Sequence, residues 1–526
     1  MRLVDYLDKG ASLGPEAPCL TTDGHTLTYA EVRDTSRRVA DALARCGVTP
    51  GQSVAILSAN DPTSFTCVFG ISRAGAVWCP INPRNEAAEN RELLDLFDCT
   101  ALLFQESFAP LVAAIAPELP KLAILVCLDG PDDTVKGALT WEQFLDADDT
   151  DATVDRVPAS APNPVAESGV ADLAMIVGTG GTTGRPKGVM LTNANLEAMT
   201  ALTLMGYPFR GRPTYLALAP LTHAAGVLSF PVLALGGEIV IMRAPDVGGF
   251  LSLVERHGVT HTFLPPTLIY MVLGHEALDT TDLSSLQCFW YGAAPMSAAR
   301  LEEALTRIGP VMAQLFGQTE APMMISMMPP ADHVDADGSP IRERLSSAGR
   351  PAPLVQVAVL DEDGREVPGG ERGEIGVRGS LVMAGYYKNP DATAEAGRHG
   401  WHHTGDIGFL DADGFLHVVD RAKDMIISGG FNVYSTEVEQ SLLAHPDVQD
   451  CAVIGVPDDK WGERVVAVVQ PYTGRSADPD DVRAFVRERI GAVKAPKEVL
   501  VWGDLPRSKV GKVLKVDIRS AVLRRP

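Results

Sequence analysis

A glycine- and threonine-rich segment between two apolar runs constrains this chain more than any other feature. It spans residues 177–189 and reads Val-Gly-Thr-Gly-Gly-Thr-Thr-Gly-Arg-Pro-Lys-Gly-Val. Glycine reaches backbone angles that other residues avoid, so successive N–H groups can turn inward and form a concave site for an anion. The hydroxyls add donors and can ligate a hard cation, and Lys187 adds a point charge suited to phosphate. The segment therefore indicates a loop that holds the triphosphate of a nucleotide.

Two known nucleotide-binding patterns do not match this segment. A Walker loop needs Gly-x-x-x-x-Gly-Lys followed by Ser or Thr, whereas Pro186 stands directly before Lys187. The dinucleotide pattern fails because Thr183 occupies the place of its third glycine. A plain flexible turn is the alternative for a glycine- and threonine-rich cluster, although the complete string through Gly188 is far more specific.

The size and charge of the chain limit its class. With 526 residues it is too long for one hydrophobic core, so about two to four lobes are expected. Hydrophobic residues make up 46% of the sequence, which predicts a folded globular protein rather than a disordered chain. The net charge of −22 argues against binding of bulk nucleic acid or of an anionic membrane surface, but not against one local basic pocket.

Targeting and cysteine patterns point to a cytoplasmic protein. Residues 1–9 interleave charged and apolar side chains, so no secretory signal is expected there. No apolar run approaches about 18 residues, so no membrane span is expected. The 8 cysteines are scattered and form no Cys-x-x-Cys pair, which predicts reduced thiols rather than a zinc site.

Short apolar runs that alternate with helical patterns predict an α/β fold. Thr28 and Glu31 have the spacing of a capping box, which predicts the start of a helix that ends at Gly47. Buried strands are expected at 53–58, 173–177, 215–218 and 238–242. Shorter strands and glycine turns between 355 and 377 predict a small β-rich lobe.

The C-terminal part of the chain is expected to form a separate compact domain. Strands are predicted at 451–456 and 465–470, and Asp478-Pro479 predicts the start of a helix with one apolar face. The boundary is placed near 420–423, which divides the chain into domains 1–420 and 424–526 with a hinge at 421–423.

Five further motifs carry residue types suited to nucleotide chemistry. Residues 316–320, Phe-Gly-Gln-Thr-Glu, offer a ring that can stack on a purine, polar donors, and in Glu320 a hard oxygen ligand of the kind that Mg²⁺ takes beside phosphates. Small residues at 292–294 allow close approach of backbone to a flat ring. The others are Thr404-Gly405-Asp406, the charged run 420–424 and the basic run 506–512. Alone, each is consistent with an ordinary turn, a solvated charge cluster or an exposed tail.

Taken in order, these motifs resemble those of the adenylate-forming superfamily, which includes acyl-CoA synthetases, peptide-synthetase adenylation domains and luciferases. The resemblance covers 177–512 and, more loosely, 20–90. It implies a large N-terminal domain of two α/β layered lobes plus a small β-rich lobe. A small, mobile α+β C-terminal domain would follow.

The resemblance also implies roles for individual residues. Catalysis would rest on Lys512, Glu320 and Thr319, because a cation between a carboxylate and the α-phosphate of ATP offsets their repulsion. Thr179 and Glu320 would ligate Mg²⁺, and Lys423 would be the hinge residue. Coenzyme A would meet Gly429, Gly430 and Phe431. ATP and AMP would be bound by Thr179, Gly180, Gly181, Thr182, Thr183, Gly184, Lys187, Gly292, Ala293, Ala294, Phe316, Gly317, Gln318, Thr319, Asp406, Arg421 and Lys512.

The sequence departs from the family pattern at four positions. Gly180 stands in place of a serine, which removes a hydroxyl but keeps the backbone N–H. Gly178 stands where an aromatic residue is common, Phe316 replaces tyrosine, and Ser435 stands where proline is frequent. None of these changes removes a charged catalytic group.

The implied reaction is the ATP-dependent ligation of an apolar carboxylic acid to coenzyme A through acyl-AMP. No acidic residue follows His223 to pair with an amino group, which disfavours an amino acid and leaves a fatty acid first and an aromatic acid next. The acyl pocket would be lined by His223, Ala225, Gly226, Leu228, Tyr291, Gly292, Met323 and Met324. Core packing is the alternative for the methionines.

Two other functions stay open. One is an adenylating enzyme that loads a carrier protein or another acceptor, and the other is a non-catalytic binding protein of the same fold. The expected partners are otherwise small molecules, and the choice between monomer and homodimer is left open.

Overall fold

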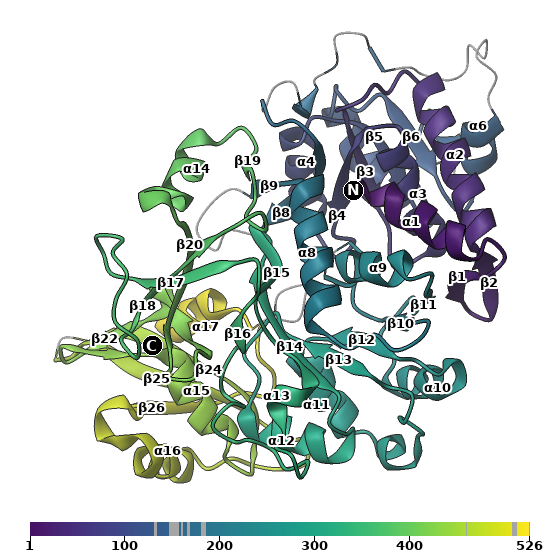
Figure 1. Ribbon diagram of the computed structural model, residues 1–526. Helices are drawn as coiled ribbons and strands as arrows, with labels where there is room; N and C mark the ends of the chain where they lie inside the picture. Colours follow the sequence, from purple (N-terminus) through teal and green to yellow (C-terminus); the bar gives the residue numbers. More distant parts are fainter. Residues whose placement is uncertain are drawn as a thin grey trace.

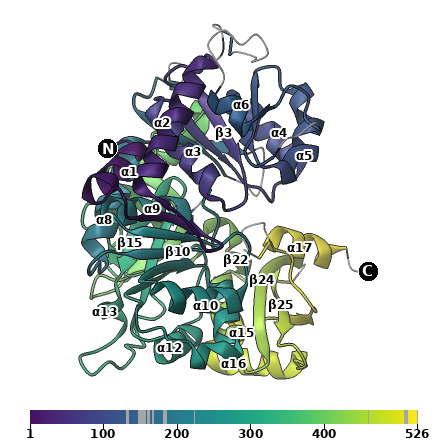
Figure 2. The same ribbon diagram turned by 90° about the vertical axis from the view of Figure 1, so that its right-hand side faces the viewer.

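The computed structural model describes residues 1–130, 134–146, 157–158, 161, 163–165, 169–179, 186–222, 224–458, 460–507 and 513–524. Within this part of the chain, four β-sheets and the surrounding helices form stacked layers, as Figures 1 and 2 show. The α/β fold class that the sequence predicts is therefore confirmed.

An eight-stranded sheet forms the first lobe. Its order is β19 (Gly385–Tyr386), β9 (Lys187–Thr192), β8 (Leu173–Thr179), β4 (Val77–Ile81), β3 (Ser53–Leu57), β5 (Cys99–Phe104), β6 (Ile124–Cys127) and β7 (Leu139–Thr140). Strand β3 is buried along its whole length, with Val54 and Ile56 in one hydrophobic cluster and Ala55 and Leu57 in another. Side chains alternate between the two faces of a strand, so helices must cover both faces of this sheet.

Among the helices of the first lobe, side-chain caps mark the start of α2 (Tyr29–Arg45) and α3 (Pro62–Arg73). The others are α1 (Leu3–Leu13), α4 (Ala87–Leu96), α5 (Ala109–Ile115) and α6 (Trp141–Asp146), with 3₁₀ turns η1 (Glu106–Phe108) and η2 (Ala116–Glu118). The predicted capping box is confirmed, because the Thr28 side chain accepts from the Glu31 N–H while Glu31 accepts from the Thr28 N–H. Gly47, with φ +86°, follows the end of α2.

A nine-stranded sheet forms the second lobe. Its order is β16 (Arg350–Pro351), β15 (Ala321–Met328), β14 (Met312–Gln318), β13 (Cys288–Tyr291), β12 (His261–Leu264), β10 (Thr214–Ala217), β11 (Glu238–Ile241), β1 (Pro18–Thr22) and β2 (His25–Thr28). The associated helices are α8 (Asn193–Gly206), α9 (Ala224–Ala234), α10 (Val247–His257), α11 (Pro266–Leu273), α12 (Ala298–Arg307) and α13 (Pro330–His333), with η3 (Glu276–Thr280).

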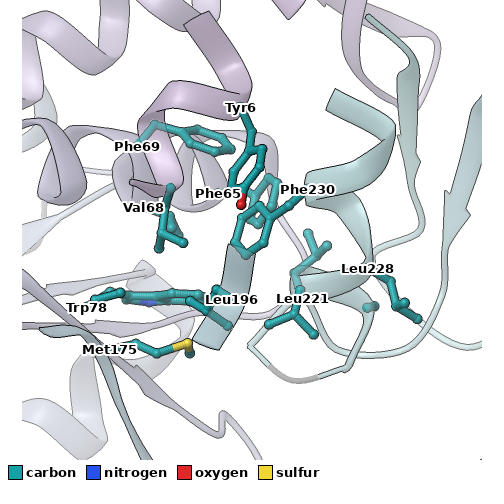
Figure 3. Packing of buried hydrophobic residues seen from close by; sticks show 14 of the residues in the cluster. Tyr6, Phe65, Val68, Phe69, Trp78, Met175, Leu196, Leu221, Leu228 and Phe230 are labelled. Carbon is teal, nitrogen blue, oxygen red and sulfur yellow. The ribbon is translucent and has the colours of Figure 1, made fainter. Parts of the chain in front are cut away.

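The two large sheets share one hydrophobic core. Its cluster contains residues of both sheets and of α1, α3, α8 and α9, which lie between them. Figure 3 shows this packing, in which the rings of Tyr6 and Phe230 stack with centroids 5.4 Å apart above Trp78. The outer face of the second sheet packs against α10, α11 and α12 in a separate cluster.

The predicted β-rich lobe is a four-stranded antiparallel sheet that extends beyond the expected range. Its order is β17 (Gln356–Leu360), β18 (Gly373–Arg378), β20 (His402–Leu410) and β21 (Leu416–Arg421), with α14 (Pro390–Ala396) and η4 (Arg398–Gly400) beside it. The turn η5 (Ala422–Asp424) follows β21 directly.

The last sheet lies in the C-terminal part of the chain. Strands β23 (Phe431–Val433), β22 (Ile426–Ser428), β25 (Gly462–Pro471) and β24 (Val448–Asp458) are neighbours, and β26 (Glu498–Val501) pairs with β25. Helices α15 (Ser435–Leu443), α16 (Pro479–Lys494) and α17 (Lys515–Leu523) pack on it, and Asp478 caps α16 as predicted. This part contacts the second lobe, where Gln440 donates to the carbonyl of Met296 at 3.2 Å (Figure 1).

Two expectations from composition are met by the described residues. All eight cysteines are buried and lie outside any disulfide, so each is a thiol. In the ranges given above, no helix combines the length and the apolar character needed to cross a membrane.

Candidate active site

The predicted phosphate loop joins two paired strands. Strands β8 and β9 are antiparallel, and the last residue of one, Thr179, lies opposite the first residue of the other, Lys187. The Thr179 hydroxyl donates to the Lys187 carbonyl at 3.4 Å. The predicted site residues Gly180, Gly181, Thr182, Thr183 and Gly184 lie outside the described residues. The two strands therefore fix both ends of the loop.

Steric contacts explain why position 178 is a glycine. A Cβ there would lie 2.9 Å from the Leu93 side chain, and a Cβ at Gly188 on the facing strand would lie 2.7 Å from the Phe97 ring. Helix α4 thus occupies the space that an aromatic residue at position 178 would need, which accounts for this departure from the family pattern.

The motif 316–320 lies at the tip of the β14–β15 hairpin. A Cβ at Gly317 would lie 2.4 Å from the backbone nitrogen of Met323, which itself has φ +63°. The hairpin therefore needs glycine at this position to let the chain fold back closely. The resulting irregularity between Phe316 and Gln318 places Thr319 and Glu320 at the turn.

The side chain of Gln318 is poised for a ligand. Its Nε2 atom is buried, and no hydrogen-bond acceptor for it is found in the described part of the chain. A buried donor without a partner is unfavourable, so a nucleotide oxygen or ring nitrogen at this place would stabilise it. The neighbouring Phe316 is half-buried against the shared core.

Lys187, predicted to bind phosphate, and Glu320, predicted to bind the metal, both contact Tyr386. The Tyr386 hydroxyl donates to Glu320 Oε1 at 2.8 Å, and Lys187 Nζ lies 4.7 Å from the centroid of the Tyr386 ring. The Glu320 backbone carbonyl accepts from the N–H of Met383 at 2.7 Å. A cation and a carboxylate from distant parts of the sequence are thus held on either side of one ring.

These residues suit a magnesium ion whose coordination is completed by oxygens of the nucleotide. No cluster of three or more potential metal ligands occurs within the described ranges, so a cage made only of protein is not found there. Glu320 Oε2 has no protein partner among these residues, and Mg²⁺ in nucleotide enzymes typically uses one or two carboxylates plus phosphate oxygens. Glu320 fits this pattern, whereas the Thr179 hydroxyl already points to the Lys187 carbonyl.

The predicted ribose-binding residues form an ion pair across neighbouring strands. Arg421 Nε lies 2.8 Å from Asp406 Oδ1, and the Asp406 side chain is only 7% exposed. The Asp406 N–H donates to the hydroxyl of Thr404 at 3.1 Å, which in turn donates to the carbonyl of Ile375 at 2.8 Å. These bonds fix the orientation of Asp406.

Glu374 on the neighbouring strand β18 binds the same part of β20. Its Oε1 accepts from the N–H of Gly405 at 3.0 Å, and its Oε2 accepts from Arg398 and from His403 Nδ1, each at 2.7 Å. Neither a charge pattern nor a motif in the sequence indicated this role. The only available signal was the position of Glu374 on a strand of the predicted β-rich lobe.

The small residues 292–294 also meet a requirement of the sheet itself. A Cβ at Gly292 would lie 2.4 Å from the carbonyl oxygen of Leu315 on the neighbouring strand, so the sheet itself requires this glycine. Ala293 is exposed and has φ +67°, a region that non-glycine residues rarely adopt. Strain of this kind is common where a ligand is held, which agrees with the predicted nucleotide contact at Ala293 and Ala294.

Most of the predicted acyl-pocket residues lie within hydrophobic clusters. Leu228 packs with Leu221 in the shared core, as Figure 3 shows, and the Tyr291 hydroxyl hydrogen-bonds to His333 at 2.9 Å in the second cluster. Ala225, Gly226, Gly292 and Met324 are also buried, whereas Met323 is partly exposed. His223 lies outside the described residues. The pocket assignment stays a prediction, and these side chains can only form its walls.

In the C-terminal part, the predicted coenzyme A residues form an exposed turn. Gly429 and Gly430 have φ of +60° and +81° between β22 and β23, and Phe431 is 60% exposed. The Trp461 carbonyl accepts from the Gly429 N–H at 2.8 Å. The proposed hinge residue Lys423 lies in η5, and Lys512 lies outside the described residues.

Tyr386 and His402 are two further residues that sequence reasoning missed. Burial and the nearby Glu320 carboxylate raise the pKa of the Tyr386 hydroxyl, so it stays a neutral donor. Burial lowers the pKa of His402, which the negative charge of Glu320 partly offsets. Neither residue lies in a recognisable motif, and only the fold brings them to Glu320.

Comparison with known families covers most of the chain. The model of the family described as "AMP-binding enzyme" matches residues 7–387, and that of "AMP-binding enzyme C-terminal domain" matches residues 437–512. Together the two matches include the predicted phosphate loop, the hairpin tip and the position of Lys512.

Similar proteins share this organisation over nearly their full length. A feruloyl-CoA synthase from Amycolatopsis sp is 38% identical over 97% of this chain and 96% of its own length. The medium/long-chain-fatty-acid–CoA ligase FadD8 from Mycobacterium tuberculosis is 34% identical over 96% of this chain and 87% of its own. The solved amide bond synthetase McbA from Marinactinospora thermotolerans aligns with a TM-score of 0.86 at 31% identity, covering 99% of both chains.

Proposed function

Because this chain belongs to the AMP-binding enzyme family, we propose that it is an ATP-dependent acid–CoA ligase that acts on an apolar carboxylic acid. The observation that carries the proposal is the meeting of Lys187 and Glu320 at Tyr386. A phosphate-binding cation and a metal-binding carboxylate side by side are what ATP activation of a carboxylate requires.

In the first step, a carboxylate oxygen of the acid attacks the α-phosphorus of ATP. The bond to the bridging oxygen of pyrophosphate breaks, and acyl-AMP forms. Both reactants are anions, so positive charge near the developing transition state governs the rate. Lys187 would offset charge on the phosphates, and Lys512 is the proposed cation at the reacting centre. When bound beside Glu320, Mg²⁺ supplies further positive charge to the phosphate oxygens.

The nucleotide would be oriented by the residues around it. Asp406 would accept hydrogen bonds from the ribose hydroxyls, since Arg421 already holds its carboxylate in place and the Thr404 hydroxyl accepts from its backbone N–H. The buried Nε2 of Gln318 would donate to the nucleotide, and the ring of Phe316 would pack against the base. Phe316 and Gln318 belong to β14 and Asp406 to β20, so the positions of these residues are set by strands.

In the second step, the thiol of coenzyme A attacks the acyl carbonyl carbon of acyl-AMP. The thioester bond forms, the thiol proton leaves, and AMP departs with the electrons of the broken acyl–oxygen bond. The Gly429–Phe431 turn is the proposed contact for the pantetheine arm. The turn is exposed in this structure, and movement of the C-terminal part about Lys423 is the proposed way in which it reaches the nucleotide site.

The proposed substrate is an apolar acid, either fatty or aromatic. The predicted pocket residues are apolar and buried, and an amino-acid substrate would lack a carboxylate partner among them. The similar proteins include one named for feruloyl-CoA and one named for medium- and long-chain fatty acids. A panel of both acid classes is therefore the deciding comparison.

The test is acid-dependent exchange of pyrophosphate into ATP, followed by AMP release with coenzyme A. We expect exchange with at least one fatty or aryl acid, and a thioester product only when coenzyme A is present. A complete lack of exchange across the panel would refute the ligase assignment and favour a binding protein.

Lys512→Ala separates the two steps in the same assay. This variant should lose roughly 100-fold or more in acyl-AMP formation, as expected when a charge that stabilises the transition state is removed. It should still convert supplied acyl-AMP to the thioester. Unchanged adenylation in the variant would exclude Lys512 as the cation of the first step.

A second candidate differs only in the acceptor. The similarity to an amide bond synthetase favours testing amines beside coenzyme A. If AMP release with the best acid is faster with amines than with coenzyme A, the chain is an acyl-adenylating enzyme with an amine acceptor.

A further inference from the structure

A short segment, Met383–Tyr387, links the metal-binding candidate to the phosphate loop. At one end, the Met383 N–H donates to the Glu320 carbonyl at 2.7 Å. At the other end, the Tyr387 N–H donates to the carbonyl of Gly188 at 2.7 Å, next to the end of the loop. Strand β19 within the segment pairs with β9, which begins at Lys187. The segment therefore sets the distance between the hairpin tip and the loop.

Tyr386 lies in the middle of this segment and contacts a charged group on each side. Its ring faces the Lys187 ammonium at 4.7 Å from the centroid, and its hydroxyl donates to Glu320 Oε1 at 2.8 Å. Both charged groups therefore have the same tyrosine as a neighbour. No ion pair of Lys187 is found in the described part of the chain.

The hydroxyl also distinguishes the two oxygens of the Glu320 carboxylate. Oε1 accepts the tyrosine proton, so Oε2 is left to face a ligand in a fixed orientation. Groups that orient a metal ligand in this way typically change metal affinity or activity about 10- to 100-fold when they are removed. The backbone bond from Met383 restrains the same residue at its other end.

We propose that Tyr386 is a positioning residue of the adenylation step, which presents Glu320 Oε2 to the magnesium ion and holds Lys187 for the phosphates. This inference rests on the proposed function. In this proposal Tyr386 acts through its two charged neighbours, Lys187 and Glu320.

Tyr386→Phe tests the hydroxyl, because it removes one oxygen and keeps the ring. Binding of Mn²⁺ with a non-hydrolysable ATP analogue, measured by electron paramagnetic resonance, should weaken about 10-fold. The half-saturating Mg²⁺ concentration in pyrophosphate exchange should rise by a similar factor, while the KM for the acid stays near the wild-type value.

Tyr386→Leu tests the ring, because it also removes the surface on which Lys187 lies. Binding of metal-free ATP, measured by calorimetry in the presence of a chelator, should weaken several-fold in this variant and remain unchanged in Tyr386→Phe. Unchanged binding of metal-free ATP by the leucine variant would overturn the part of the proposal that concerns Lys187.

Tyr387→Phe is the matched control. The hydroxyl of Tyr387 donates to the buried carboxylate of Asp98 instead of to Glu320. This variant should lower the thermal midpoint and leave Mn²⁺ binding as in the wild type. A loss of Mn²⁺ affinity in Tyr387→Phe equal to that in Tyr386→Phe would show a general structural effect and overturn the proposal.

Glu320→Gln distinguishes failure of this inference from failure of the proposed function. If Glu320→Gln weakens Mn²⁺ binding and Tyr386→Phe does not, the positioning role is wrong while the function stands. If Glu320→Gln leaves Mn²⁺ binding unchanged, the metal role of Glu320 is wrong and the positioning proposal falls with it.

Discussion

At the scale of single residues, the site is assembled from charged groups that already have partners. Asp406 pairs with Arg421, Glu320 with Tyr386, and Glu374 with three donors. Partners that fix an acceptor before the ligand arrives reduce the ordering that binding requires. The nucleotide would therefore meet carboxylates whose directions are set by neighbouring strands.

The ribose-binding role of Asp406 gives a prediction at this scale. Asp406→Asn keeps the size of the side chain but removes the charge that would accept from the ribose hydroxyls. Because hydrogen bonds to charged groups contribute about 1.5–3 kcal/mol, kcat/KM for ATP should fall roughly 10- to 100-fold. Kinetics with ATP and with 2′-deoxy- and 3′-deoxy-ATP would measure both the fall and any loss of discrimination between them.

The same hairpin offers a control for this prediction. Asp413 lies exposed in the turn between β20 and β21, and Asp413→Asn should leave both kinetic values unchanged. If Asp406→Asn discriminates against the deoxynucleotides as strongly as the wild type does, Asp406 does not contact the ribose.

Residue roles could be predicted from sequence where the chemistry is local. The glycines at 317 and 292 and the acid at 320 were found as motif members, because each motif is a short contiguous string. Tyr386 could not be found in this way, since its partner Glu320 lies 66 residues away. A second reason for Gly292 could not be found from the sequence, because the Leu315 carbonyl that requires a glycine belongs to another strand.

At the scale of elements, local sequence signals predicted where helices start better than they predicted which side chains are buried. The capping residues Thr28 and Asp478 were identified correctly, because a cap and its helix are adjacent in the sequence. The burial of Leu228 and Tyr291 was harder to foresee, because it depends on which helices lie on each face of a sheet. The placement of the acyl pocket from sequence was limited for this reason.

A polar network connects the elements on either side of the proposed hinge. Asp420 at the end of β21 accepts hydrogen bonds from the backbone and the hydroxyl of Ser435 at the start of α15. Lys515 at the start of α17 donates to the Ser435 hydroxyl at 2.6 Å and pairs with Glu439 at 2.7 Å. Rotation that separates Asp420 from Ser435 would have to break these bonds.

Lys515→Met should destabilise the C-terminal part by about 3 kcal/mol, because it leaves the buried Glu439 carboxylate without its cation. Burial already raises the pKa of Glu439 despite the nearby Lys515. The loss of stability would be measured as faster amide hydrogen exchange in α15 and in the adjoining β24.

The double variant Lys515→Met/Glu439→Gln provides the control for this network. Glutamine keeps an acceptor for the Val453 N–H, which Glu439 now binds at 2.8 Å, but carries no charge. Stability should therefore recover by more than half. If the single and the double variant exchange equally fast, the pair does not account for the effect.

At the scale of the whole molecule, strand pairing joins segments that are far apart in the sequence. Strand β1, near the start of the chain, pairs in parallel with β11, so the first residues complete the sheet of the second lobe. Short apolar runs predicted most of these strands but not their neighbours, because pairing is decided by packing over the whole fold. The alternation of strands and helices therefore predicted an α/β fold, but not the order of the strands in each sheet.

Two buried histidines predict how the whole fold responds to acid. Burial lowers the pKa of His261 and of His333 to about 4, well below the ordinary value of 6.5. In the folded protein both stay neutral as the pH falls from 6.5 towards 4, whereas the unfolded chain takes up two protons. Their contribution to stability is complete above pH 6.5 and should decrease by about 3 kcal/mol per histidine as the pH reaches 4.

His333→Gln tests this origin of acid sensitivity. The glutamine cannot take up a proton in the folded or the unfolded state. The thermal midpoint of the variant should therefore fall less steeply than that of the wild type between pH 6.5 and 4.5. Calorimetric scans across this range would measure the two slopes. The curve of a variant that also carries His261→Gln should be flatter again. The two effects should add, since the His261 ring packs on Phe209 and Trp290 whereas the His333 ring packs on Tyr291. Parallel curves for all three proteins would assign the acid sensitivity to carboxylates instead of to these histidines.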